Sequence, residues 1–307
     1  MSWKKLAVFA AASCVALYFV ATTGMAGGPE SVPAEQPAPQ EEVLPAQPVV
    51  ETPPEAAGKP MEEPAAEGVE EPVSEPAAEP LVYDYSQPAP ETSAVEKEYF
   101  ADAAFVGDSR TDGFMIYSGI GRGENLTSNG LSIFKLESKK ALKIGGEEFT
   151  LLEALGRKQY GKVYLCLGVN ELGVYDDEGF YRAYLSAIDA IRACQPKAVI
   201  YIQGLIPLNE EDVAAAGGKD YLENDHLRIY NELMFKAAQE KQVVFLDLYT
   251  AFADENGALP TGASRDGVHL NKEYCQKWLA YLQTHTVDPA LLGITETETE
   301  SKENVPA

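Results

Sequence analysis

The chain has 307 residues, with 48 acidic against 24 basic side chains and a formal net charge of −24. No cluster of Lys and Arg offers a footprint for a phosphate backbone, so no nucleic-acid partner is expected. Its four cysteines are widely spaced and suggest neither a disulfide framework nor a zinc site: Cys14, Cys166, Cys194 and Cys275.

Residues 1–28 have the features of an export signal. Lys4 and Lys5 precede an apolar run from Leu6 to Ala21, and Gly24-Met25-Ala26 is a small-residue cleavage site. Because the run is long for a signal peptide, a retained membrane tether through residues 6–25 is the competing interpretation. A lipid-modified Cys14 is a third, although the apolar run continues past it. In each case the rest of the chain is exported: extracellular, cell-wall associated or membrane-anchored with the catalytic domain outside.

Residues 29–98 are rich in Pro, Glu and Ala and hold fifteen of the chain's 20 prolines. Sixteen Glu and one Asp stand there against Lys59 and Lys97. Such a segment has too few large apolar groups to offset its ordering entropy, so it predicts a disordered, acidic spacer. The composition of residues 289–307 predicts a disordered acidic tail. The folded part is expected over residues 99–288, as one domain.

Strand and helix signals alternate along residues 99–288. Continuous apolar runs predict buried strands at Ala103–Gly107, Val163–Leu167, Ala198–Ile202 and Val243–Leu246. Apolar residues at helical spacing, or a good N-cap such as Asn271, predict helices at Glu178–Cys194, Tyr221–Glu240 and Lys272–Thr284. This alternation predicts a three-layer α/β/α sandwich with a parallel sheet. Ligands of such sheets bind beyond the carboxyl ends of the strands.

A serine, a histidine and an aspartate stand where this fold predicts a site. Ser109 follows the first strand, and Asp266 and His269 lie three residues apart just before the last helix. A serine hydroxyl needs an imidazole to take its proton and a carboxylate to orient that imidazole. These three are therefore the catalytic candidates, although Asp108 and Ser109 alone are also typical of a helix N-cap.

Two further residues are candidates for binding a developing oxyanion. Asn170 follows the second predicted strand, where its side-chain amide can donate or where it can simply form a turn. Gly130 can offer a backbone N–H with no side chain in the way, but glycine is also the usual turn residue.

Together these motifs resemble the SGNH, or GDSL-type, hydrolases. The motifs that carry the resemblance are Gly107-Asp108-Ser109, Gly130, Gly168-Val169-Asn170 and Asp266-Gly267-Val268-His269. The resemblance implies a flavodoxin-like sheet and ester hydrolysis through an acyl-serine, with Ser109, His269 and Asp266 as the triad. It also implies an oxyanion hole made of the Ser109 and Gly130 N–H groups and the Asn170 side chain. No metal or organic cofactor is expected.

Two residues depart from the family pattern. Glu171 stands where Asp is usual after the asparagine, and Arg110 stands where Leu often follows Gly-Asp-Ser. Both are candidate substrate-binding residues. For Arg110 the alternative is a structural pairing with Glu171 or another carboxylate.

The combined pattern predicts an exported serine esterase that hydrolyses small acyl esters, acetyl above all, on a glycan or related substrate. The export signal, the spacer and the absence of a large apolar lid favour this hypothesis. The segment Gly204–Asp220 is expected as a long loop beside the site. Three alternatives remain open: an O-acyltransferase on the same scaffold, a lipase-like acylhydrolase and a non-catalytic module that binds wall glycans. The sequence leaves the oligomeric state open.

Overall fold

The computed structural model describes residues 82–294. The predicted export signal or membrane tether, most of the predicted spacer and most of the predicted tail lie outside the described residues. No helix in residues 82–294 is long and apolar enough to cross a membrane.

Five parallel strands form the central sheet, in the order β2-β1-β5-β6-β7. Their bounds are β1 (Ala103–Gly107), β2 (Glu124–Thr127), β5 (Lys162–Cys166), β6 (Val199–Gln203) and β7 (Val244–Leu246). The strands β1, β6 and β7 are buried along their whole length, as parallel strands covered on both faces must be. The predicted flavodoxin-like sheet is confirmed.

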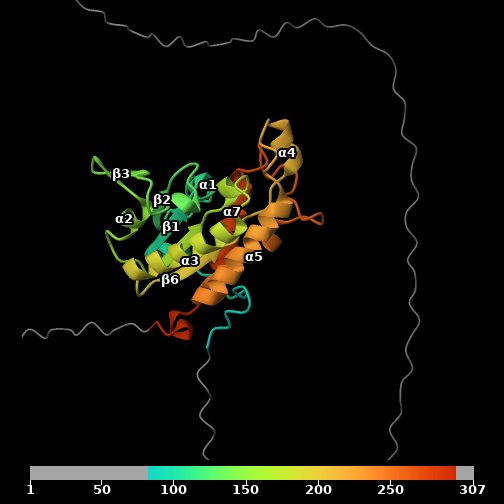
Figure 1. Ribbon diagram of the computed structural model, residues 1–307. Coiled ribbons are helices and arrows are strands. Elements are labelled where there is room, and N and C mark those ends of the chain that lie inside the picture. Colours follow the sequence, from blue (N-terminus) through green and yellow to red (C-terminus); the bar gives the residue numbers. More distant parts are fainter. Residues whose placement is uncertain (1–81, 295–307) are drawn as a thin grey trace, which may run out of the picture. The chain divides into compact units, whose positions relative to one another are not determined.

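Helices cover both faces of the sheet (Figure 1). On one face α1 (Ser109–Tyr117) packs against α7 (Lys272–Thr284). On the other, α3 (Asp177–Cys194) packs against α5 (Asn224–Lys241) and α2 (Leu151–Leu155). The shorter elements are α4 (Glu210–Ala215), α6 (Leu248–Phe252), a hairpin of β3 (Leu142–Ile144) and β4 (Glu147–Phe149), and the 3-10 helices η1 (Lys97–Phe100), η2 (Ile133–Lys135), η3 (Val169–Glu171) and η4 (Pro289–Leu292). The three-layer α/β/α sandwich is thus as predicted.

A ladder of aromatic rings crosses the middle of the sheet. Phe105, Tyr164 and Tyr201 are register partners on β1, β5 and β6. Their rings stack with centroids 4.9 and 4.6 Å apart, and all three are fully buried. Phe114 of α1 and Trp278 of α7 pack with each other, and Phe114 also packs against Phe105. The α1–α7 pair is therefore held on the sheet by aromatic contacts, which fixes the start of each helix relative to β1.

The folded part extends further than the expected residues 99–288. Backbone N–H groups of the segment 82–98 donate to carbonyls of β7 and the carboxyl end of α7: Ala89 N to Phe245 O, Val95 N to Gln283 O and Thr92 N to Thr284 O. At the other end Tyr83 N donates to Leu291 O of η4, which the sequence placed in the tail. Composition averaged over a Pro-rich window hides such a segment, because its order comes from bonds to distant parts of the chain.

The segment Gly204–Asp220 is not one long loop. It contains α4, which Asn209 caps by accepting a hydrogen bond from the Asp212 N–H. The part after α4, Ala216–Gly218, does lie beside Ser109, as expected of this segment.

Candidate active site

Ser109 is the first residue of α1 and directly follows the turn at the end of β1. The turn needs a glycine, because a Cβ on Gly107 would lie 2.2 Å from Thr111 Oγ1 and 2.8 Å from the Cys166 carbonyl oxygen. Asp108 is the N-cap of α1 and accepts a hydrogen bond from the Arg110 N–H. The helix is therefore capped by Asp108 and not by Ser109, which leaves the Ser109 hydroxyl available for catalysis.

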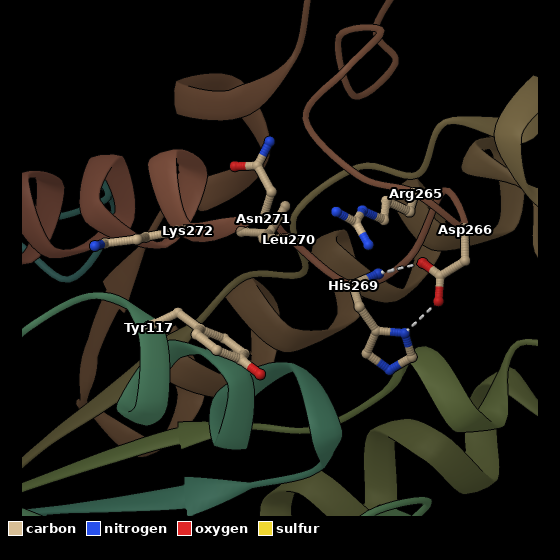
Figure 2. A pocket seen from close by; sticks show the side chains of 7 residues that line it. All are labelled: Tyr117, Arg265, Asp266, His269, Leu270, Asn271 and Lys272. Carbon is tan, nitrogen blue, oxygen red and sulfur yellow. Dashed lines mark hydrogen bonds and ion pairs between the residues drawn. The ribbon is translucent and has the colours of Figure 1, made fainter.

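The three catalytic candidates form one hydrogen-bonded chain. Ser109 Oγ lies 2.8 Å from His269 Nε2, and His269 Nδ1 lies 2.7 Å from Asp266 Oδ2. Figure 2 shows the Asp266 carboxylate joined both to the ring and to the backbone N–H of His269. The structure brings the three predicted residues together, although 160 positions separate Ser109 from His269.

Asp266 is held as a carboxylate. Burial alone raises its pKa, but hydrogen bonds from the backbone N–H and ring of His269 and from the Val268 N–H outweigh burial. The pKa of Asp266 therefore lies well below its usual range, and the group stays charged wherever His269 can act as a base. A fixed negative charge there orients the ring and stabilises its protonated form.

The loop that carries Asp266 and His269 depends on Gly267, which the sequence motif includes, and on Ser264, which sequence reasoning missed. Gly267 has a φ of +75°, and a Cβ on it would lie 2.2 Å from the Asn209 carbonyl oxygen. Ser264 Oγ lies 3.0 Å from Asp266 Oδ1 and 2.8 Å from the His269 carbonyl oxygen, so it braces both ends of the Asp-x-x-His turn. The glycine between the two catalytic candidates was a usable signal. No sequence pattern marks the serine.

The three oxyanion candidates differ in how free their donors are. The Asn170 amide already donates to Asp108 Oδ2 and to the Leu131 carbonyl, both at 3.0 Å, so an oxyanion would have to share one of these hydrogens. The backbone N–H groups of Ser109 and Gly130 have no hydrogen-bond partner within residues 82–294. Gly130 adopts a φ of +67° in the turn after β2. Gly130 therefore forms a turn, as glycine usually does, and its backbone N–H is still free to donate a hydrogen bond.

Arg110 and Glu171, the two substrate-binding candidates, have buried side chains. Arg110 is 5% exposed and donates to the Ile206 carbonyl at 2.9 Å. Glu171 is fully buried, and its Oε1 accepts a hydrogen bond from the Ile133 N–H. The Arg110 and Glu171 side chains do not form a hydrogen bond or ion pair with each other. Arg110 nevertheless lines the pocket of about 260 Å³ beside Ser109, so its substrate-binding role stays a prediction, whereas Glu171 lines none of the pockets beside His269.

The site is open on both sides of Ser109 and His269. A pocket of about 350 Å³ on one side includes Asn170 and Tyr221, and one of about 260 Å³ on the other includes Ile116, Tyr117 and Asn129. Tyr117 is 51% and Tyr221 37% exposed. Each flank of the serine therefore carries an accessible aromatic ring.

No group of three or more His, Cys, Asp or Glu side chains in residues 82–294 is arranged to hold a metal ion. Cys166, Cys194 and Cys275 are free thiols, and burial raises the pKa of Cys166 to about 12. Cys166 and Cys275 are therefore small buried side chains and not reactive groups, whereas Cys194 is half-buried.

The chain matches the family model described as the GDSL-like lipase/acylhydrolase family over residues 105–276. It belongs to that family, a class of esterases and acylhydrolases, and the match spans every catalytic candidate. No curated protein matches the chain in sequence.

Several solved structures are similar to the chain. A Streptococcus pneumonia protein described provisionally as a platelet activating factor is 20% identical, with a TM-score of 0.49, over 62% of this chain and 84% of its own. A GDSL-like lipase from Bacteroides thetaiotaomicron is 15% identical, with a TM-score of 0.43, over 59% of this chain and 86% of its own. A peptidoglycan O-acetylesterase is 18% identical, with a TM-score of 0.40, over 52% of this chain and 45% of its own. Structures this distant say nothing of the activity, so the family assignment rests on the family match.

Proposed function

We propose that the protein is a serine esterase in which Ser109 is the nucleophile. His269 Nε2 takes the Ser109 proton as Oγ forms a bond to the ester carbonyl carbon, and the same proton then goes to the departing alcohol oxygen. In the second half, His269 takes a proton from water as the water oxygen bonds to the acyl carbon; the bond to Ser109 Oγ then breaks, Oγ takes that proton back from His269, and the acid is released. The observation that carries this proposal is the hydrogen-bonded chain from Ser109 through His269 to Asp266.

The tetrahedral intermediate needs donors for its oxygen. The free N–H groups of Ser109 and Gly130 supply two, and the Asn170 amide shares a third with its present partners. Loss of one such donor typically costs about 3–4 kcal/mol of transition-state stabilisation.

The substrate we propose is a glycan or related molecule that carries small acyl groups, acetyl above all. Tyr117 and Tyr221 support this proposal, because exposed aromatic rings on both sides of the nucleophile are suited to stacking on sugars. The export that the sequence predicts agrees with this proposal, since acylated glycans are accessible outside the cell. N-terminal sequencing of the secreted protein tests export: a start near Gly27 indicates a cleaved signal, and an intact start in the membrane fraction indicates a retained tether.

Hydrolysis of 4-nitrophenyl acetate and of longer 4-nitrophenyl esters tests the activity. We expect the acetate to be the best substrate, and Ser109→Ala to lower kcat/KM by at least roughly a thousandfold. Ser138→Ala, at an exposed serine that lines none of the pockets beside His269, is the matched control and should keep full activity.

Activity on long chains alone would move the proposed substrate to lipids. If no ester were cleaved in a Ser109-dependent way, the esterase proposal would be wrong. Transfer to a sugar acceptor or glycan binding would then take its place.

A further inference from the structure

A third pocket, of about 520 Å³, opens beside His269 (Figure 2). Its lining is Tyr117, Arg265, Asp266, His269, Leu270, Asn271 and Lys272. Figure 2 shows the Arg265 guanidinium close to His269 and the Tyr117 hydroxyl directed toward the same ring, while Lys272 lies farther out. The pocket therefore begins at the catalytic base and carries two cations and an aromatic ring.

Neither cation of this pocket has a partner within residues 82–294. Every other arginine there is paired with a carboxylate, bonded to a backbone carbonyl or stacked on a ring: Arg110, Arg122, Arg157, Arg182, Arg192 and Arg228. The one carboxylate of the pocket, Asp266, is engaged by His269. Two free cations therefore lie in one pocket whose single carboxylate is already engaged.

The proposed mechanism determines which part of the substrate lies next to this pocket. The acyl carbonyl faces the donors at Ser109 and Gly130. The alcohol oxygen must lie at His269 Nε2, from which it receives its proton. The alcohol part of the ester therefore lies against His269, which also lines the pocket that holds Tyr117, Arg265 and Lys272.

We propose that this pocket is an anion subsite for the alcohol part of the ester. Arg265 and Lys272 bind a carboxylate or phosphate of the leaving group, and Tyr117 packs against its ring. This inference rests on the proposed esterase function and makes it more specific: the preferred substrates are acyl esters of acidic sugars. Sequence reasoning considered anion recognition at Arg110, and the structure assigns it to Arg265, whose guanidinium is exposed.

The expected size of the effect follows from charge interactions near a protein surface. One such pair is worth a few-fold in binding, so two cations together should favour an anionic over a neutral leaving group by roughly five- to thirtyfold at low salt. Because both cations are exposed, about 1 M salt should remove most of this preference.

The experiment compares 4-carboxyphenyl acetate with 4-carbamoylphenyl acetate, two esters of nearly the same shape that differ in charge. In the full chain we expect Arg265→Gln/Lys272→Gln to lower the ratio of their kcat/KM values by roughly five- to thirtyfold, with a smaller loss at high salt. The control Lys139→Gln/Lys143→Gln removes the same two charges from exposed positions outside the pockets beside His269, and should leave the ratio unchanged. A ratio within twofold of wild type, or an equal fall in the control, would overturn the proposal.

A third ester, 4-(phosphonooxy)phenyl acetate, separates the two sources of negative charge. The larger loss in Arg265→Gln/Lys272→Gln identifies the group for which the subsite is built.

Binding separates a failed subsite from a failed esterase. The affinities of 4-hydroxybenzoate and 4-hydroxybenzamide are measured on Ser109→Ala, with and without Arg265→Gln/Lys272→Gln. A carboxylate preference that depends on the two cations supports the subsite even if no ester is cleaved. Equal affinities contradict the subsite even if the esterase is active.

Discussion

Two buried carboxyl groups, Asp108 and Glu171, flank Asn170 behind the nucleophile. Burial raises the pKa of Asp108 to about 6 and that of Glu171 to about 7. Asp108 is well bonded, since its two oxygens accept from the Arg110 N–H and the Asn170 amide. Glu171 Oε2 has no hydrogen-bond partner among the described residues. Glu171 is therefore the carboxyl group whose ionisation the fold tolerates least.

Glu171→Gln should stabilise the protein at high pH. A carboxyl group with a raised pKa binds its proton more tightly in the folded than in the unfolded protein. Glu171 therefore does not lower the free energy of unfolding below pH 4.5, the pKa of the unfolded state, but it lowers that free energy increasingly as the pH rises to about 7. The variant should therefore match wild type near pH 4.5 and exceed it by up to about 3 kcal/mol at pH 8. Urea unfolding at the two pH values measures this difference.

Glu148→Gln, at an exposed position of β4, is the matched control and should show no such pH dependence. A Glu171→Gln variant that is equally stable relative to wild type at both pH values would mean that Glu171 ionises freely in the fold.

At the scale of elements, the Asp266–His269 turn is shaped by one glycine. Gly267→Ala would place a Cβ within 2.2 Å of the Asn209 carbonyl oxygen, in a left-handed conformation that alanine disfavours. We expect a loss of roughly 2–4 kcal/mol in the free energy of unfolding. Since a shift of about 1 Å in His269 can cost a hundredfold, kcat/KM should fall about as much. Urea unfolding and 4-nitrophenyl acetate hydrolysis measure the two effects.

Gly262→Ala separates backbone strain from the clash. Gly262 has a similar φ of +84°, but no atom lies within 4 Å of a Cβ built there. This control should lose only about 1 kcal/mol and keep its activity. Equal losses in the two variants would show that the close approach to Asn209 is unimportant.

The sequence predicted the strands whose burial is uniform, including the edge strand β7, and missed the strands whose residues are mostly exposed or half-buried. β1 was predicted with its observed bounds, Ala103–Gly107, because all five residues are buried. β2 was missed, since this edge strand has the polar sequence Glu-Asn-Leu-Thr with one buried side chain. The β3–β4 hairpin was missed too, although its turn Gly145-Gly146 is a common hairpin signal. Local patterns therefore reveal buried strands, while strands with polar sequences depend on neighbours in space.

The same contrast holds for the site. The three residues of the hydrogen-bonded chain could be selected from the sequence, because a nucleophile, a base and an orienting carboxylate need particular residue types at particular ends of elements. The burial of Arg110 and the bracing by Ser264 depend on the packing of distant segments, which no local pattern records. The role proposed for Arg265 likewise needed the structure, because the absence of a partner cannot be seen in a sequence.

At the scale of the whole molecule, the segment 82–98 decides where the domain begins. It bonds to β7 and to the carboxyl end of α7, whereas His269 lies just before the other end of that helix. A helix of 13 residues is about 20 Å long, so this segment supports the fold from a point remote from the catalytic chain. Stability and activity should therefore respond differently to its removal.

Two truncated chains test this separation, one of residues 82–294 and one of residues 99–294. The longer should match the full chain in stability and in kcat/KM for 4-nitrophenyl acetate, since all catalytic candidates lie within residues 105–276. The shorter loses the bonds from Ala89, Thr92 and Val95, at about 1 kcal/mol each, and should be less stable by roughly 2–4 kcal/mol. At low temperature, where it stays folded, its kcat/KM should be unchanged. Equal stability of the two truncated chains would mean that the domain begins near residue 99. A loss of activity without a loss of stability would mean that the segment 82–98 contributes to the active site.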